Sequence, residues 1–269
     1  MMHPVYKPET LKTLLLSLNL SLTKEKGQNF LLDSDVLAKM ASFFKDTLPI
    51  LEIGPGIGHF TRYLIEKNQP VTVVELDKGF VRYLEKELGK KIKIIHKDFL
   101  KFSFSDLEYP KIVLAGNIPY SITKDILFRL FRNLSFIDEA FILMQAEAGE
   151  KLLAEPGTKK YGRLSVLTGF YTEAQILFYV PPKAFFPQPH VDSVYMRFKP
   201  KNKDYDKGFE EWLNIVFSNR RKTLASVFKK KLGNEIFDRI LKEFAFTVNT
   251  RAETLDPETL YKLYLKMKQ

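Results

Sequence analysis

The sequence predicts an α/β fold in which a mostly parallel seven-stranded sheet is followed by a small all-helical domain. Short apolar runs alternate with helical stretches between residues 49 and 200, which is the pattern of βαβ crossovers. The last two apolar runs have no long helix between them, so the last strand should be antiparallel, in a hairpin at the sheet edge. After Pro200 a polar linker, 201–208, leads into residues 209–268, which are helical by periodicity.

The expected elements follow in order along the chain. One or two helices and a loop fill residues 1–48. Strands are expected at 49–53, 71–75, 91–95, 111–115, 140–144, 175–180 and 193–198. Helices are expected from the first glycine turn to about residue 67, and at 78–88, 123–133 and 146–154. We therefore expect a sheet domain over residues 1–200, with an N-terminal helical extension over 1–48, and a helical domain over 201–269.

Composition restricts the class of protein. The 269 residues (31.3 kDa) are 45% hydrophobic and 28% charged, as in ordinary globular proteins. Cysteine is absent, which excludes disulfides, a Cys-ligated zinc site, an iron–sulfur cluster and a Cys nucleophile. No apolar run reaches the roughly 18 residues of a membrane span, and the start of the chain lacks a small-residue cleavage site. We expect a cytoplasmic protein that makes no membrane contact.

The chain is basic. Lys and Arg number 42 against 32 Asp and Glu, giving a net charge of +10. A polyanionic partner is therefore expected, with nucleic acid ahead of membrane. Charge alone does not decide this, because many lysine-rich proteins bind no polyanion.

A glycine-rich turn, Glu52-Ile-Gly-Pro-Gly-Ile-Gly58, separates the first strand from its helix. Glycines there let a ligand approach the backbone, beside the free N–H groups of a helix N-terminus. Dinucleotide folds use G-x-G-x-x-G, whose third glycine would fall at His59. The spacing here is G-x-G-x-G, which suits a ligand with a carboxylate and a ribose but no pyrophosphate. That ligand is S-adenosyl-L-methionine (AdoMet), and a nicotinamide oxidoreductase is the weakest alternative.

Two acidic residues end the next two strands. Glu75 lies 21 residues after Gly54, where a carboxylate can accept hydrogen bonds from both ribose hydroxyls. Asp98 ends the third strand and can accept one from the adenine amino group. Each alone would equally be a helix N-cap. Together with the glycine turn they mark the carboxyl ends of three successive strands, which predicts a Rossmann-like class I methyltransferase sheet with AdoMet as cofactor.

The fourth strand ends in Asn117-Ile-Pro-Tyr120. An exocyclic adenine amine is a poor nucleophile, and acceptors such as the Asn117 side-chain oxygen and the Ile118 carbonyl help to localise its lone pair. Pro119 fixes the backbone, and Tyr120 can stack on a base taken out of its helix. A sulfonium is a good methyl donor, so no metal or strong general base is needed. The alternative is an ordinary turn, but after the glycine turn we favour catalysis.

Together these segments resemble the KsgA (RsmA) family of ribosomal RNA adenine dimethyltransferases over nearly the whole chain. Four further segments carry the resemblance, namely Gly27–Leu31, Pro156–Val166, Phe185–Ser193 and Asn219–Leu224. The resemblance implies a cofactor site made of Asn29, Leu31, Gly54, Gly56, Glu75, Asp98 and Asn117. It also implies that Phe186 stacks on the target adenine opposite Tyr120. Two departures stand out. His190 replaces the usual Lys and would weaken one phosphate contact, and His59-Phe60 replaces a small or aliphatic pair with no expected effect on chemistry.

The resemblance also implies the reaction. Such enzymes transfer four methyl groups to two adjacent adenosines near the 3′ end of 16S rRNA, giving N6,N6-dimethyladenosine during ribosome biogenesis. The implied partner is the 30S ribosomal subunit or its precursor, and the implied oligomeric state is a monomer.

Basic residues supply candidates for phosphate contacts. They are Lys159, Lys160, Arg163, Arg220, Arg221 and Lys222. A further run, Lys229–Lys231, is equally well explained as a solvated helix face. For 220–222 the resemblance favours RNA.

Three other functions stay open at this point. An Erm-type enzyme, which dimethylates one adenosine of 23S rRNA, shares the cofactor turn and an Asn-Ile-Pro-aromatic segment, but Tyr161–Arg163 and Asn219–Leu224 argue against it. A non-catalytic RNA-binding factor in ribosome assembly or transcription could use the same fold, although the intact 117–120 segment favours catalysis. DNA adenine methyltransferases more often begin this segment with Asp and carry two prolines in it.

Overall fold

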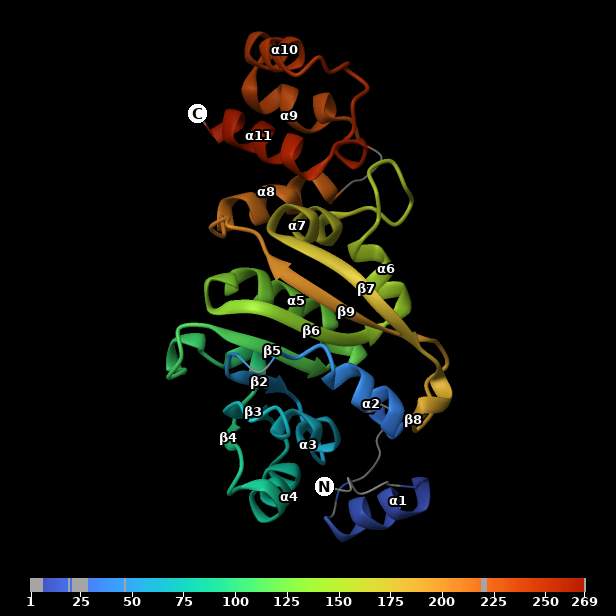
Figure 1. The fold of residues 1–269 in the computed structure, drawn as a ribbon. Coiled ribbons are helices and arrows are strands. Elements are labelled where there is room, and N and C mark those ends of the chain that lie inside the picture. Colours follow the sequence, from blue (N-terminus) through green and yellow to red (C-terminus); the bar gives the residue numbers. More distant parts are fainter. Residues whose placement is uncertain (1–6, 19, 21–28, 46, 219–221, 269) are drawn as a thin grey trace. The chain divides into compact units, whose positions relative to one another are not determined.

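The computed structural model describes residues 7–18, 20, 29–45, 47–218 and 222–268 (Figure 1). The chain forms two compact units. The first comprises residues 1–149 and 174–200, and the second comprises residues 150–173 and 201–269. The segment 150–173 thus clusters with the C-terminal helices, although it lies within the first 200 residues.

The first unit is built on a seven-stranded sheet with the order β4-β3-β2-β5-β6-β9-β7. Its strands are β2 (Ile50–Ile53), β3 (Val71–Glu75), β4 (Lys93–His96), β5 (Ile112–Asn117), β6 (Ile137–Gln145), β7 (Thr172–Val180) and β9 (Ser193–Pro200). From β4 to β6 all neighbours are parallel, whereas β9 pairs antiparallel with β6. The predicted fold class is confirmed. The antiparallel hairpin expected at the sheet edge consists of β9 and β7, with β7 outermost.

Helices connect the parallel strands as crossovers. They are α3 (His59–Ile65), α4 (Lys78–Leu88) and α5 (Thr123–Arg132). The chain moves outward from β2 to β3 and β4, and later in the opposite direction from β5 to β6. Because such crossovers are right-handed, α3 and α4 cover one face and α5 covers the other. The reversal between β2 and β5 is a topological switch point, where sheets of this kind bind ligands.

One face of this sheet carries a core shared with α3, α4 and α2 (Ser34–Ala41). Alternate strand residues such as Val71, Val73, Val113 and Ala115 point into it, as period-2 side chains must. Two further elements precede α2, namely α1 (Pro8–Ser17) and β1 (Phe30–Leu31). The strand β1 pairs antiparallel with β8 (Phe185–Phe186) in a separate two-stranded sheet, which the sequence did not predict.

Short 3₁₀ turns and a further helix also belong to this region of the chain. The turns are η2 (Phe99–Lys101), η3 (Phe104–Asp106), η4 (Tyr120–Ile122), η5 (Leu134–Phe136) and η6 (Pro182–Ala184), and the helix is α6 (Ala146–Leu152). None of the helices in the described part of the chain has the length and apolarity that crossing a bilayer requires.

The second unit is helical apart from the first residues of β7. Its elements are α7 (Arg163–Tyr171), α8 (Lys207–Phe217), α9 (Leu224–Leu232), α10 (Asn234–Glu243), η7 (Ala252–Thr254) and α11 (Pro257–Lys268). Aromatic side chains form its core, with the Phe209 ring 5.3 Å from Phe170 and 5.0 Å from Tyr261 between centroids. The buried Tyr161 hydroxyl donates to the Leu255 carbonyl at 2.7 Å. These contacts hold segment 150–173 to the C-terminal helices.

Candidate active site

The glycine turn follows β2 in the conformation that its sequence predicts. Gly54, Gly56 and Gly58 have φ angles of +60°, +57° and +74°, a region that L side chains rarely adopt. A Cβ at Gly58 would lie 2.8 Å from a methyl of Leu84, so this glycine permits α3 to pack on α4. A Cβ at Gly54 would meet no atom within 4 Å. Gly54 therefore leaves open space above the backbone, as close approach of a ligand requires.

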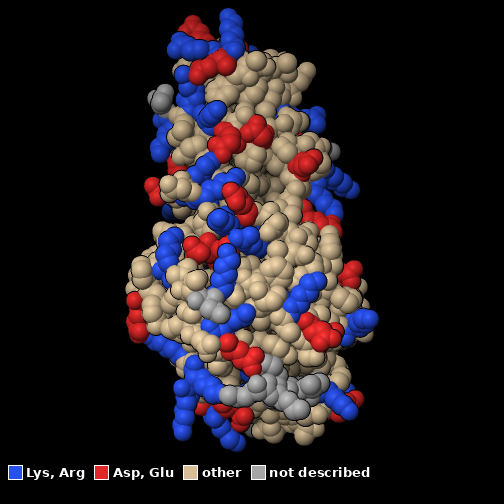
Figure 2. Space-filling view, in the orientation of Figure 1, with Lys and Arg blue, Asp and Glu red and all other residues tan. Residues whose placement is uncertain are grey.

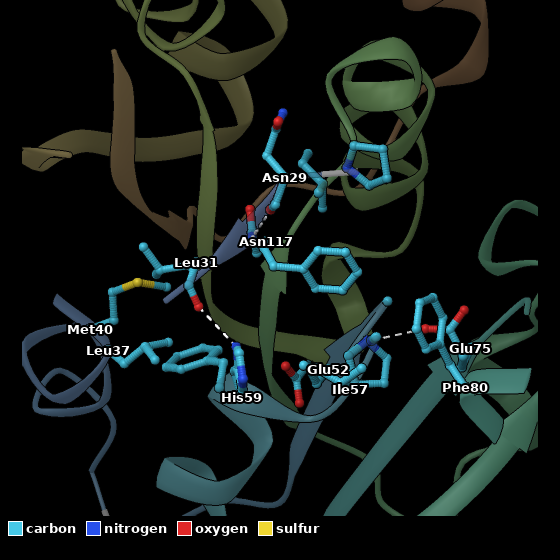
Figure 3. A pocket seen from close by; sticks show the side chains of 17 residues that line it. Asn29, Leu31, Leu37, Met40, Glu52, Ile57, His59, Glu75, Phe80 and Asn117 are labelled. Atoms are coloured by element: carbon cyan, nitrogen blue, oxygen red, sulfur yellow. Dashed lines mark hydrogen bonds between the residues drawn. The ribbon is translucent and has the colours of Figure 1, made fainter. Parts of the chain in front are cut away.

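A pocket opens above this turn, at the carboxyl ends of β2, β3 and β5 (Figure 3). Six of the seven predicted cofactor residues line it, namely Asn29, Leu31, Gly54, Gly56, Glu75 and Asn117. They come from chain segments up to 88 residues apart, as the Asn29–Asn117 contact shows. The pocket thus lies at the topological switch point of the sheet.

Glu75 is buried at the pocket wall and held by three backbone N–H groups. Its Oε2 accepts from Gly56 N at 3.0 Å, and its Oε1 accepts from the N–H groups of Leu76 and Asp77, both at 2.8 Å. Burial raises the pKa of the Glu75 carboxyl, and these N–H groups act in the opposite direction. A carboxylate has about four acceptor positions, so one remains for a ligand hydroxyl without loss of any of these bonds.

Asp98 occupies the corresponding place after β4 but has a different environment. It is half-buried, and its Oδ1 accepts from Leu100 N at 2.8 Å as the N-cap of η2. Among the described residues it is not one of those that line the pocket. The structure therefore shows the capping bond that the sequence also allowed, and the adenine contact of Asp98 stays a prediction.

Glu52 lies beneath the glycine turn and also lines the pocket. It is only 2% exposed, and its Oε2 accepts from the Thr61 hydroxyl at 2.6 Å. Burial raises the pKa of Glu52 to about 8, against the effect of the Thr61 bond. The side chain is therefore mostly neutral at pH 7.

Asn117 ends β5 beside the glycine turn, and its side chain is oriented by the N-terminal segment. Its Nδ2 donates to the Asn29 carbonyl at 3.3 Å (Figure 3). Because a carbonyl oxygen can only accept, the amide nitrogen must face Asn29. The Asn117 Oδ1 is left as the acceptor on the other side of the amide, which is the role that the sequence predicts for it.

The two residues after Asn117 are fixed by backbone hydrogen bonds. Ile118 N donates to the Leu143 carbonyl of β6 at 3.2 Å, and its side chain is 1% exposed. The Pro119 carbonyl accepts from Ile122 N at 3.2 Å and from the Thr123 hydroxyl at 3.3 Å. Ile118 and Pro119 both line the pocket. The Tyr120 side chain lies outside the described residues.

Comparison with known proteins identifies the family. The model of the family described as "Ribosomal RNA adenine dimethylase" matches residues 19–269. The chain belongs to the ribosomal RNA adenine dimethylase family. It is therefore an rRNA-methylating enzyme, which confirms the predicted family and enzyme class. A nicotinamide oxidoreductase and a DNA methyltransferase no longer need to be considered.

The chain is also similar to named relatives and to solved structures. The "Ribosomal RNA small subunit methyltransferase A" of Francisella tularensis subsp. novicida is 38% identical over 245 residues, which cover 86% of this chain and 92% of the relative. The protein of the same name from Mycoplasma mobile is 36% identical over 238 residues, with coverages of 87% and 93%. A dimethyladenosine transferase from Plasmodium falciparum has the same fold, with a TM-score of 0.75, 24% identity and coverages of 88% and 96%. The 23S rRNA methyltransferase ErmE gives a TM-score of 0.67 at 25% identity, with coverages of 90% and 100%.

Phe186, the predicted stacking aromatic, lies on β8 and is half-buried. It packs against a cluster that includes Ile57 and Phe80, both of which line the pocket. The Lys12 ammonium lies 5.2 Å from the centroid of its ring. Phe186 is thus next to the pocket wall without being part of it, and its contact with an adenine stays a prediction.

Several pocket residues were not singled out from the sequence. They are Phe30, Leu37, Met40, Pro55, Ile57, Phe60 and Phe80. Phe30 lies within the Gly27–Leu31 segment that carried the family resemblance. Its position beside Asn29 and Leu31 could therefore have indicated that it lines the pocket. Leu37, Met40 and Phe80 lie on helices at apolar positions, which sequence alone cannot distinguish from ordinary core. His59 also lines the pocket, although the sequence gave no reason to expect an effect from it.

The predicted RNA contacts are less well defined. Lys159, Lys160 and Lys222 are exposed and Arg163 is half-buried, whereas Arg220 and Arg221 lie outside the described residues. Lys160 pairs with Glu150 at 2.5 Å. On the face shown in Figure 2, basic side chains are interspersed with acidic ones. The distribution of charge on that face therefore does not identify an RNA-binding surface.

Proposed function

We propose that the protein dimethylates N6 of two adjacent adenosines near the 3′ end of 16S rRNA in the small ribosomal subunit, with AdoMet as methyl donor. The observation that carries this proposal is the position of Asn117–Pro119 beside the glycine turn, at the switch point of a methyltransferase sheet. The name of the relatives, small subunit methyltransferase A, supports the choice of subunit.

The pocket fits the proposed cofactor. Glu75 offers an acceptor for a ribose hydroxyl, and the open space at Gly54 admits a ligand to the backbone. Ile57 and Phe80 provide apolar walls. Asn29, Leu31 and Gly56 complete the cofactor contacts, with Asp98 as acceptor for the adenine amine. When bound, AdoMet supplies an electrophilic methyl group, so this site needs no metal.

The protein's contribution to the chemistry is positioning and hydrogen bonding. The Asn117 Oδ1 and the Ile118 carbonyl accept from the target amine and localise its lone pair. The bonds from Ile118 N to β6 and from η4 to the Pro119 carbonyl keep these acceptors fixed before the substrate arrives. Phe186 and Tyr120 stack on the extruded base.

The proposed partner is 16S rRNA within the 30S subunit or its precursor, bound by a monomer in the cytoplasm, with a role in ribosome biogenesis. Lys159, Lys160, Arg163, Arg220, Arg221 and Lys222 are the proposed phosphate contacts. Such contacts make affinity depend on salt. Residues 1–200 are proposed as the catalytic domain and residues 201–269 as the rRNA-binding domain.

Methyl transfer to two substrates in parallel tests this proposal. Unmethylated small subunits and unmethylated 23S rRNA are each offered labelled AdoMet. We expect label on the small subunits alone. Label on 23S rRNA would move the protein to the Erm-type enzymes, to which ErmE gives a structural link. AdoMet binding without transfer to either substrate would contradict the proposed target adenosines.

A further inference from the structure

A short N-terminal segment, residues 29–33, contacts three parts of the site. We call this segment the strap. The Asn29 carbonyl accepts from Asn117 Nδ2 at 3.3 Å, and the Leu31 carbonyl accepts from His59 Nδ1 at 3.0 Å. Within the strap, β1 pairs with β8, so that Phe30 lies opposite Phe186. One segment thus connects the catalytic segment, the glycine turn and the proposed base-stacking residue.

The pairing of β1 with β8 is too short to hold itself in place. It consists of two register pairs, Phe30 with Phe186 and Leu31 with Phe185, and isolated two-stranded ribbons are marginal in water. Two further bonds run from Leu32 N and Asp33 N to the Ala184 carbonyl, at 2.8 and 3.3 Å. The placement of β8 therefore depends on two things: the burial of Ala184 and Phe185 in the sheet core, and what anchors the strap to the rest of the unit.

His59 is such an anchor, because its ring contacts the Leu31 carbonyl from the start of a helix. It is the first residue of α3, directly after Gly58 in its left-handed conformation. Because the Leu31 carbonyl can only accept, Nδ1 must carry the proton. Burial lowers the pKa of His59 to about 4, and the positive charge of Arg62 acts in the same direction. The ring is therefore a neutral donor, with its proton on Nδ1, at neutral pH.

Figure 3 shows the His59 ring rising from the glycine turn towards Leu31. Phe30, the neighbour of Leu31, lies close to the turn. A Cβ at Gly56 would lie 3.2 Å from the Phe30 ring, and that ring meets Phe80 edge-on at 5.9 Å. A ligand over the glycine turn thus lies against the strap, and the strap pairs with β8.

We propose that His59 is a positioning residue that couples occupancy of the cofactor pocket to the placement of Phe186 through the β1–β8 pair. The coupling rests on the proposed function, since it requires AdoMet in the pocket and a base-stacking role for Phe186. It gives a reason for the histidine at a position where the sequence led us to expect no effect. Cofactor binding would order β8 before the adenosine arrives.

Backbone hydrogen exchange tests the coupling without turnover. In the full-length protein, saturating AdoMet should slow exchange in peptides that cover 54–58, 29–33 and 184–190. In His59→Ala we expect AdoMet still to protect 54–58, but its effect on 184–190 to be lost. His59→Asn should restore that effect, because an Asn amide nitrogen can occupy the Nδ1 position and donate to Leu31. His96→Ala is the matched control, since it removes another histidine–carbonyl contact, from Nε2 to Leu76 at 3.1 Å.

Steady-state kinetics provides a second readout that general destabilisation would not reproduce. At saturating AdoMet, His59→Ala should raise the KM for small subunits about three- to tenfold, as expected for one hydrogen bond. His59→Asn should return the KM to near the wild-type value, with kcat changed less than KM.

The outcomes separate the two proposals. Protection of 54–58 without protection of 184–190 in the wild type would overturn the coupling and leave the cofactor assignment intact. Equal protection of 184–190 in wild type and His59→Ala would also overturn it. No protection at 54–58 in the wild type would overturn the cofactor assignment and the coupling together.

Discussion

The carboxyl ends of β3 and β4 present the same sequence signal and differ in structure. Each strand leads into an acidic residue, Glu75 or Asp98, before a helical turn. All residues of β3 are buried, whereas β4 is the outer strand and none of its residues is buried. Glu75 is held by three N–H groups in the pocket wall, and Asp98 caps a 3₁₀ turn.

The position of a strand in the sheet therefore decides which hydrogen-bond partners its terminal carboxylate finds. β3 lies next to β2, so Glu75 reaches the N–H of Gly56 in the glycine turn. β4 is one strand farther from the switch point, and its carboxylate finds its first partner locally. Sequence spacing treats the two acids alike, since it carries no information on strand order.

The largest expected effect on cofactor binding is at Glu75. In Glu75→Gln an amide NH₂ replaces one of the oxygens that face the three backbone N–H groups, so a donor confronts a donor. We expect AdoMet affinity to fall about a hundredfold, which corresponds to about 2.7 kcal/mol. Isothermal titration calorimetry measures the AdoMet affinity of both proteins. An affinity within threefold of wild type would show that the buried carboxylate is not the ribose acceptor.

Glu52→Gln should change how stability depends on pH. Folded Glu52 keeps its proton up to its pKa of about 8, whereas in the unfolded chain the carboxyl loses it near 4.5. The unfolded state therefore binds fewer protons between these values, and stability falls as pH rises through this window, by up to about 1.4 kcal/mol per pH unit. The raised pKa of Glu75 adds a slope of the same sign, whereas the lowered pKa of His59 gives a slope of the opposite sign below about pH 6.5. The variant retains both.

Urea unfolding from pH 5 to 9 measures this slope. In Glu52→Gln the amide oxygen can still accept from Thr61, so we expect a shallower fall and a more stable protein at pH 8. Equal slopes in both proteins would mean that Glu52 is ionised in the folded state at neutral pH.

The smallest expected effect is at Asp98. Asp98→Asn keeps an oxygen for the cap on Leu100, since Asn caps as well as Asp. It replaces the other oxygen by a group that cannot accept from an adenine amine. We expect a loss of AdoMet affinity of about fivefold, near the value of one hydrogen bond, with thermal stability unchanged. A hundredfold loss would contradict the contrast with Glu75. An unchanged AdoMet affinity would mean that Asp98 does not contact the cofactor.

The regular elements were predictable because their signals are local. β3 and α4 have the bounds that the sequence predicts, since Pro70 precedes a β-branched run and Asp77 caps the helix. The glycine turn and Asn117 were predictable as well, because they follow strands at a known place in such sheets.

The β1–β8 pair was not predictable, because it joins segments about 155 residues apart through two residues each. The bond from His59 to Leu31 was not predictable either. Its acceptor is a backbone carbonyl, which every residue type has, so the sequence does not distinguish it.

The most direct test of the account is the count of dimethyladenosines in 16S rRNA after reaction, by nucleoside mass spectrometry. We predict two per small subunit with the wild type and none with Asn117→Ala. Asn133→Ala is the matched control, because Asn133 also donates from Nδ2 to a backbone carbonyl, that of Arg129 at 2.7 Å, away from the pocket. It should give two. Full dimethylation by Asn117→Ala would contradict the claim that the end of β5 activates the adenine amine.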